Sequence, residues 1–236
     1  MKKLAREQAN ANLEKEAGTL DVEYEWNRAR QNQPLKEAVA VLKKMAGKRE
    51  RCMYCGDSHG TDIEHFWPKG KAFYPERMFR WTNMLLGCTD CGRIKGTQFP
   101  LAAGLPLLVK PTVDDPWQFL DFDPATGNIV PRFDTATNST TPKGEQTVAV
   151  LQLDRREALA SGYQKTFARI SEQIKNILPS PAPDARALIH GLMIADEYGL
   201  LGWCFRGTGV SVFPLNNLRQ QHPALWSECA QIFKYF

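Results

Sequence analysis

Residues 51–95 decide the fold of this chain, and they read RCMYCGDSHGTDIEHFWPKGKAFYPERMFRWTNMLLGCTDCGRIK. Two Cys-x-x-Cys pairs enclose the stretch, Cys52 with Cys55 and Cys88 with Cys91. Thiolates at this spacing are typical of a tetrahedral zinc site, and four sulfur ligands leave no coordination position for water. We therefore expect a closed, structural Zn²⁺ at these cysteines.

Chemistry-bearing residues lie between the two cysteine pairs. The string DIEHF resembles a strand, and it carries Glu64 followed directly by His65. A carboxylate is a hard ligand suited to Mg²⁺ or Mn²⁺, and the pKa of imidazole suits a base near neutral pH. Hydrolysis of a phosphodiester needs a cation that stabilises the leaving oxygen and a base that activates water. The dyad therefore predicts a catalytic site beside the zinc.

Composition sets the class of protein. The chain has 236 residues, of which 43% are hydrophobic and 24% are charged, as in an ordinary globular protein. The net charge of +4 permits a polyanionic partner without demanding one. No apolar run is long enough to cross a membrane, and the N-terminal lysines precede no apolar segment of a secretory signal. We expect a cytoplasmic protein without a membrane partner, in which six cysteines favour metal binding over disulfides.

The chain divides into three expected stretches. Residues 1–50 are rich in helix formers, and the apolar residues of 35–45 predict a helix between Pro34 and Gly47. The basic residues that follow are either a solvated helix face or a phosphate-facing edge beside the zinc. Residues 51–111 contain many glycines and prolines, so we expect a loop-rich segment that needs metal to fold.

The third stretch, residues 112–236, predicts a hairpin followed by helices. Asp123 and Pro124 begin turn chemistry between two apolar runs in WQFLDFDPATGNIVPRF. Helical periodicity then predicts one long helix over 143–178, a second over 184–198 and a short final helix in PALWSECAQIFKYF.

The central motifs resemble those of the HNH (ββα-metal) endonucleases. The resemblance runs over 51–100 and comprises Cys-x-x-Cys, I-E-H-F-x-P-K and W-x-N-x-L-L-x-C-x-x-C with a following lysine. More narrowly, these residues are similar to PtuB, the HNH subunit of Septu-type antiphage systems and their retron-linked relatives. The resemblance implies a small zinc-stapled ββα-metal module at 51–111. Together with the helices and the β-hairpin expected from the residues on either side, this gives an α+β fold, mainly helical, with an N-terminal helical extension at 1–50 and a hairpin and helical region at 112–236.

The same resemblance implies a role for each matching residue. His65 matches the general base, Glu64 the first ligand of the catalytic Mg²⁺ or Mn²⁺, and Asn83 the residue that pins the loop holding the base. Lys95 matches a basic residue near the substrate phosphate. The substrate-binding candidates are Lys95, Arg93 and Lys69.

One position departs from the family pattern. The family usually has Asn or His directly after the last cysteine, as a second ligand of the catalytic metal, whereas this chain has Gly92. Two functions therefore stay open. The first is a metal-dependent endonuclease acting on DNA or RNA, tRNA included; the second is a catalytically impaired nucleic-acid-binding or adaptor subunit.

The resemblance also implies partners. They are a PtuA-type ATPase subunit and, in retron-linked systems, a reverse transcriptase with its nucleic acid. The aromatic C-terminal segment and the polar N-terminal stretch are the expected docking segments, because chain ends are poorly ordered unless something holds them. The apolar residues of the C-terminal segment are Leu225, Trp226, Ile232, Phe233, Tyr235 and Phe236.

Overall fold

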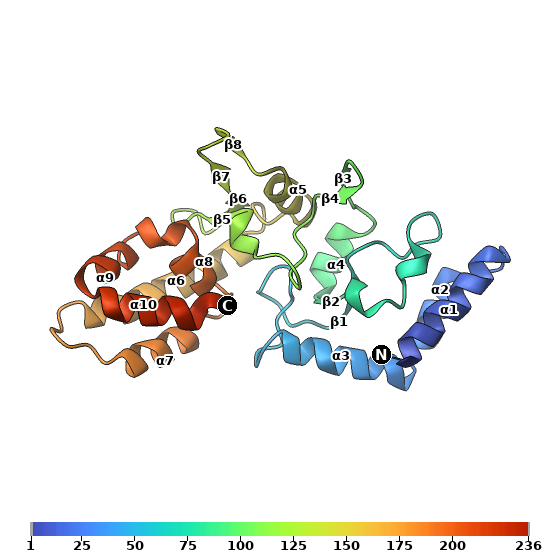
Figure 1. Ribbon diagram of the computed structural model, residues 1–236, viewed down its shortest axis with the longest axis horizontal. Coiled ribbons are helices and arrows are strands. Elements are labelled where there is room, and N and C mark those ends of the chain that lie inside the picture. The colour runs from blue at the N-terminus through green and yellow to red at the C-terminus, as the bar shows by residue number, and fades with distance from the viewer. Residues whose placement is uncertain (1, 236) are drawn as a thin grey trace. The chain divides into compact units, whose positions relative to one another are not determined.

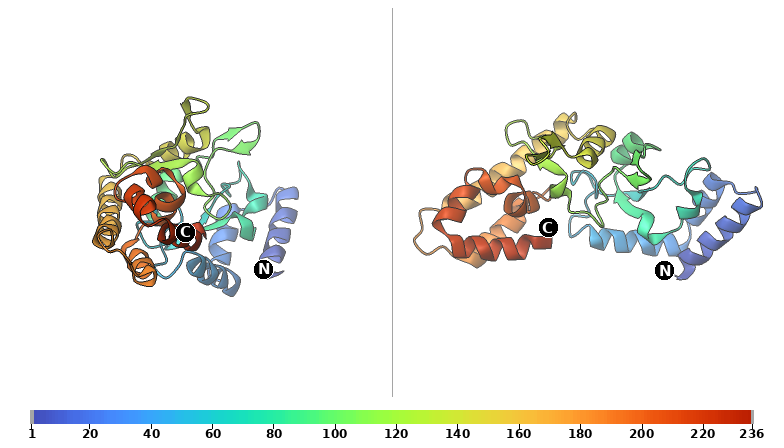
Figure 2. Two further views of the ribbon diagram at one scale, coloured as in Figure 1. Left: turned by 60° about the vertical axis from the view of Figure 1, so that its left-hand side comes forward. Right: turned by 45° about the horizontal axis from the view of Figure 1, so that its top comes forward.

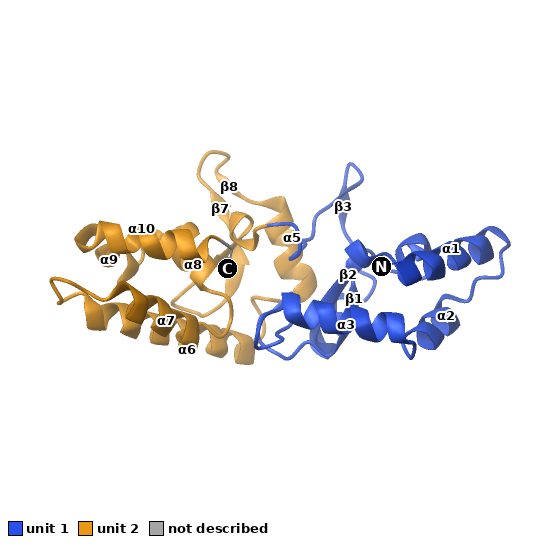
Figure 3. Cartoon of the chain, turned by 60° about the horizontal axis from the view of Figure 1, so that its bottom comes forward, with its two compact units in different colours: residues 1–114 blue, residues 115–236 orange. Residues whose placement is uncertain are grey.

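The computed structural model describes residues 2–235 and divides the chain into two compact units, residues 1–114 and residues 115–236 (Figure 3). The first two expected stretches lie together in the first unit. Helices dominate, and the strands form short antiparallel pairs (Figure 1). The expected α+β, mainly helical class is confirmed. No helix among the described residues is both long and apolar enough to span a membrane.

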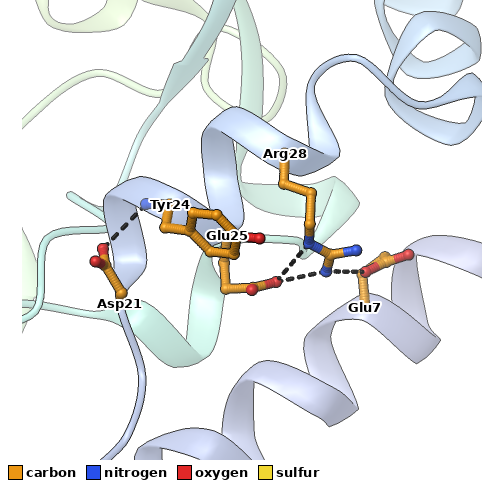
Figure 4. A network of polar contacts seen from close by, with 5 residues as sticks. All are labelled: Glu7, Asp21, Tyr24, Glu25 and Arg28. Carbon is orange, nitrogen blue, oxygen red and sulfur yellow. Dashed lines mark hydrogen bonds and ion pairs between the residues drawn. The ribbon is translucent and has the colours of Figure 1, made fainter.

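Three helices precede the cysteine motif of residues 51–95: α1 (Lys2–Glu16), α2 (Val22–Ala29) and α3 (Gln33–Met45). The third confirms the helix expected between Pro34 and Gly47. Asp21 caps the start of α2, because its carboxylate accepts hydrogen bonds from the backbone N–H groups of Glu23 and Tyr24. Arg28 on α2 pairs with Glu25 and with Glu7 of α1 (Figure 4). This network adds little stability, because the Arg28 side chain is 43% exposed.

The cysteine motif folds as two strands followed by a helix. Strand β1 (Asp62–His65) pairs antiparallel with β2 (Met84–Gly87), so that Glu64 faces Leu85 and His65 faces Met84. Helix α4 (Thr89–Lys95) follows β2 directly. The loop from β1 to β2 contains two single-turn helices, η1 (Pro75–Arg77) and η2 (Trp81–Asn83). The buried apolar side chains of α1, α2 and α3 form one cluster with those of β1, β2 and this loop.

A short hairpin ends the first unit. Strands β3 (Leu101–Ala102) and β4 (Leu105–Pro106) pair antiparallel. The hairpin stands out from the rest of its unit (Figure 2), and Leu105 is 70% exposed. Ala103 and Gly104 have positive φ angles of 48° and 77°, as a two-residue turn between strands requires.

The second unit begins with η3 (Pro116–Gln118) and the predicted hairpin, whose strands are β5 (Leu120–Phe122) and β6 (Ile129–Pro131). The turn chemistry is confirmed, because the Asp123 carboxylate accepts the backbone N–H of Ala125 and the hydroxyl of Thr126. A second pair, β7 (Phe133–Asp134) and β8 (Ser139–Thr140), follows.

The prediction of a single long helix over 143–178 is wrong. The chain forms α5 (Pro142–Leu151) and α6 (Glu157–Ile177) instead. Gln152 ends α5 with a φ of 51°, and its N–H binds the carbonyl of Val148. This left-handed residue turns the chain so that both Leu151 and Leu153 are buried.

The remaining helices are α7 (Ala185–Ala195), α8 (Leu201–Arg206), α9 (Leu215–Gln221) and α10 (Pro223–Ile232), with single turns η4 (Thr208–Ser211) and η5 (Phe233–Tyr235). Asp184 caps α7 as expected. The helix α7 ends before the predicted residue 198, because the Asp196 carboxylate accepts backbone N–H groups of the next turn, from Tyr198 to Leu201.

Leu225, Trp226 and Phe233 of the C-terminal segment are buried, and the rings of Trp226 and Phe233 contact Phe205. Phe236 lies outside the described residues.

Candidate metal and catalytic site

The four cysteines of the two pairs come together as one buried cluster. Their Sγ atoms all lie within 4.8 Å of one another. The Sγ atoms of Cys55 and Cys88 are 3.9 Å apart, close to the edge of about 3.8 Å that four Zn–S bonds of about 2.3 Å give in a tetrahedron. Cys88 also begins α4, where its sulfur accepts the N–H of Cys91. The cluster could hold a zinc ion.

Hydrogen bonds among the sulfurs distribute the protons unevenly. Bonding from Cys52 lowers the pKa of Cys55 to about 7 and also lowers that of Cys88. The pKa values of Cys52 and Cys91 are raised, through the bonds that these thiols make to Cys55 and Cys52 respectively. A metal that binds all four sulfurs must displace the protons of the thiols, so its affinity depends on pH.

The ring of His65, at the end of β1, is held by a backbone carbonyl. Its Nε2 lies 2.8 Å from the carbonyl oxygen of Met78. A carbonyl only accepts, so Nε2 carries the proton and Nδ1 of the neutral ring carries the lone pair. Burial, together with the positive charge of Lys69, lowers the pKa of His65 to about 3. The ring is therefore neutral at neutral pH, with its lone pair on Nδ1.

Trp26 of α2 covers His65. The two rings meet edge to face with their centroids 4.5 Å apart. Only 5% of His65 is exposed.

Glu64 has one carboxylate oxygen engaged and one open. Oε1 accepts a hydrogen bond of 2.8 Å from the Lys95 ammonium, which also donates to the carbonyl of His65 at 2.8 Å. Oε2 has no hydrogen-bond partner within residues 2–235 and faces Gly92, where an added Cβ would lie 3.3 Å away. Burial raises the pKa of Glu64, and the positive charge of Lys95 opposes that rise.

The open oxygen suits a hard divalent cation. The Glu64 side chain is 17% exposed, so solvent reaches it. Mg²⁺ commonly keeps several water ligands and takes one or two carboxylates from the protein. Glu64 could therefore bind such an ion through Oε2, with water or a substrate oxygen in place of the ligand that Gly92 lacks.

Asn83 joins the two ends of the loop between β1 and β2. Its Oδ1 accepts the N–H of Trp67 at 2.7 Å, and its Nδ2 donates to the carbonyls of Trp67 and Arg77 at 3.0 and 3.1 Å. Only 3% of the residue is exposed. Because Met78 follows Arg77, these bonds help to fix the carbonyl that holds His65.

The three basic candidates occupy different environments. Lys95 is fully buried against Glu64, so its ammonium lies inside the site. Lys69 is half-buried, with its Nζ 5.5 Å from the Trp26 ring centroid, and burial lowers the pKa of its ammonium. Arg93 is exposed on α4.

Two residues near the site were missed by the motif. Trp26 has a local signal only as a member of the apolar face Val22, Trp26 and Ala29, whose spacing predicts a helix but not its contact with His65. Tyr54 lies between the first two cysteines. Its hydroxyl is buried without a hydrogen-bond partner in the described chain, and burial together with the charge of Glu64 raises its pKa.

Comparison with known proteins finds one informative similarity. No family model matches the chain, and no solved structure matches it. The Septu protein PtuB of Bacillus thuringiensis is 27% identical over 133 residues, which are 54% of this chain and 46% of that protein. The chain thus spans about half the length of this curated relative. The similarity agrees with the resemblance to PtuB that the motifs carry.

Proposed function

We propose that this chain is a metal-dependent HNH endonuclease and the effector subunit of an antiphage defence complex of the Septu type. The observation that carries the proposal is the neutral His65 ring, held through Nε2 by the Met78 carbonyl, directly next in the chain to Glu64, whose Oε1 is held by Lys95, on a hairpin that adjoins the four cysteines. The similarity to PtuB supports the defence role.

The residues of the site have separable tasks. His65 accepts the proton of an attacking water at Nδ1, while the Met78 carbonyl holds the protonated Nε2 in place. Glu64 binds the divalent cation through Oε2, and Lys95 holds the other carboxylate oxygen. When bound, that Mg²⁺ or Mn²⁺ supplies positive charge for the leaving oxygen of the phosphodiester. Asn83 holds the loop that supplies Met78.

The proposed substrate is a nucleic-acid backbone, DNA or RNA. Arg93 is exposed one residue after Gly92 and can meet a phosphate, and the partly buried Lys69 adds positive charge beside Glu64. Contacts of this kind carry no sequence information. We propose a PtuA-type ATPase as partner, with a retron reverse transcriptase as a further partner in retron-linked systems.

Cleavage by the wild-type protein and its His65→Ala variant tests the function. Both are assayed with Mg²⁺ or Mn²⁺ on duplex DNA, single-stranded DNA and tRNA, with and without the neighbouring ATPase. Loss of a general base should slow cleavage about 10²–10⁴-fold. His59→Ala, which removes an exposed histidine, is the matched control and should cleave normally. Normal cleavage by the His65 variant would place the base elsewhere.

The second candidate function is a nucleic-acid-binding or adaptor subunit with impaired catalysis. Gly92 favours it, because the position beside Glu64 Oε2 offers no side-chain ligand. Under this function the wild-type protein binds nucleic acid and cleaves none of the substrates, with or without the ATPase.

A further inference from the structure

The carbonyl that holds His65 belongs to a segment outside the sheet. Met78 follows the single turn η1, in the loop between β1 and β2. Its neighbours in this segment, Pro75 and Phe79, are both buried. The direction of the Met78 carbonyl, and with it the direction of the His65 ring, depends on what fixes this segment.

Gln8 of α1 forms hydrogen bonds with the segment on both sides of Met78. Its Nε2 donates to the carbonyl of Pro75 at 3.1 Å, and its Oε1 accepts the N–H of Phe79 at 2.6 Å. Because a backbone carbonyl only accepts and a backbone N–H only donates, these two partners fix the orientation of the amide, which also donates to Asn12 Oδ1 at 3.0 Å. Gln8 is 6% exposed, although glutamine is a residue type found mostly at the surface.

Helix α2 contacts both this segment and His65, through Trp26. Trp26 stacks on Phe79 with a centroid separation of 5.9 Å, and its ring also meets His65. The ring of His65 is thus fixed by residues of the N-terminal helices, which lie outside the cysteine motif.

We infer that Gln8 is a positioning residue for His65, which it directs through the backbone of Pro75–Phe79 and the carbonyl of Met78. This inference rests on the proposed function for its catalytic consequence but not for its structural one. Gln8 touches neither substrate nor metal in this role. It sets the place of the lone pair on Nδ1, and a base displaced by about 1 Å can lose about 10²-fold in rate.

Gln8→Met tests the inference, because methionine keeps the length of the side chain and removes the hydrogen bonds to Pro75 and Phe79. The exposed Asn10 on the same helix provides the control Asn10→Ala. The first readout is solvent exchange of the His65 Nε2 proton, followed by NMR of ring-labelled full-length protein. We expect this exchange to be at least about tenfold faster in the Gln8 variant and unchanged in the control. Zinc content and circular dichroism confirm that each variant is folded.

The second readout compares the change in kcat with the change in KM for cleavage. We expect kcat to fall at least about tenfold with little change in KM, because substrate binding does not use Gln8. A folded Gln8→Met protein with wild-type proton exchange and wild-type kcat would overturn the inference. If it does not fold, Gln8→Glu decides, since glutamate keeps the acceptor for Phe79 and loses the donor to Pro75. Wild-type values in that variant would also overturn it.

The two proposals fail in different ways. If His65→Ala cleaves normally, the proposed function fails, while the proton-exchange readout still tests the contact of Gln8 with the Met78 segment. If His65→Ala is inactive and the Gln8 variants match the wild type in both readouts, only the positioning role fails.

Discussion

The buried neutral ring of His65 should make the stability of the hairpin β1–β2 fall as the pH falls. The pKa of His65 is about 3 in the folded chain and 6.5 in its ordinary, exposed state. Between these values the unfolded chain binds a proton that the folded chain does not, so acid favours unfolding. Above about pH 6.5 the ring is neutral in both states, and it adds no pH dependence.

The size of the effect follows from the same two values. One pKa unit corresponds to about 1.4 kcal/mol, and about pH 5 lies roughly 1.5 units below the unfolded pKa. Lowering the pH from about 7.5 to about 5 should therefore remove about 2 kcal/mol from the free energy of unfolding. In His65→Gln this contribution disappears, because glutamine does not titrate and can still donate to the Met78 carbonyl.

Urea unfolding of the two proteins measures the difference. Each protein is equilibrated in urea at several pH values with zinc in constant excess, then pulse-labelled with deuterium, and peptides covering β1 and β2 are read by mass spectrometry. The cysteines and Glu64 also respond to acid, but both proteins contain them, so the difference between the two profiles isolates His65. The His59→Gln variant should follow the wild-type profile. Parallel profiles for the wild type and His65→Gln would refute the buried neutral ring.

Three further perturbations test the site. Cys88→Ser should lower the zinc content below one ion per chain and unfold the hairpin, as measured by elemental analysis and deuterium uptake, whereas Cys204→Ser should keep the metal; a folded variant with full zinc content would contradict this. Lys95→Met should weaken Mn²⁺ binding, followed by electron paramagnetic resonance, by about 10–100-fold, because Glu64 loses the partner that orients it. Lys71→Met removes the same charge at an exposed position and serves as its control, and unchanged or tighter Mn²⁺ binding to the Lys95 variant would show that Lys95 does not assist the metal. Gly92→Asn should lower the Mg²⁺ concentration needed for half-maximal cleavage, and an unchanged requirement would mean that another group already completes the coordination.

Local patterns in the sequence were sufficient where neighbouring residues make the structure. The two cysteine pairs predicted the sulfur cluster, because each pair is a single turn. Asp123 predicted its hairpin turn, and Asp184 predicted the start of α7, since each side chain caps backbone groups two or three residues away. The break at Gln152 was missed because glutamine carries no turn signal. Its left-handed conformation follows from the burial of both neighbouring leucines.

Contacts between distant residues explain what the sequence could not give. Lys95 was expected near a substrate phosphate, yet its ammonium is buried on Glu64, 31 positions away in the chain. The carbonyl partner of His65 could not be predicted either, because every residue has a carbonyl and only the folded loop selects Met78. Asn83 was predictable only in part. Its presence in the motif was visible in the sequence, but its three backbone partners were not.

These contacts separate the chemistry of the site from its geometry. Under the proposed function, Glu64 and His65 would supply a metal ligand and a proton acceptor, but a four-residue strand paired with one other strand is too small to hold them alone. Zinc would brace one end of the hairpin, and the first helix with Asn83 fixes the loop at the other. An HNH-like motif can therefore retain its catalytic residues and still lose activity through changes in residues 1–45, which no motif covers. Such losses would appear in kcat and in the exchange of the His65 ring proton, with zinc content unchanged.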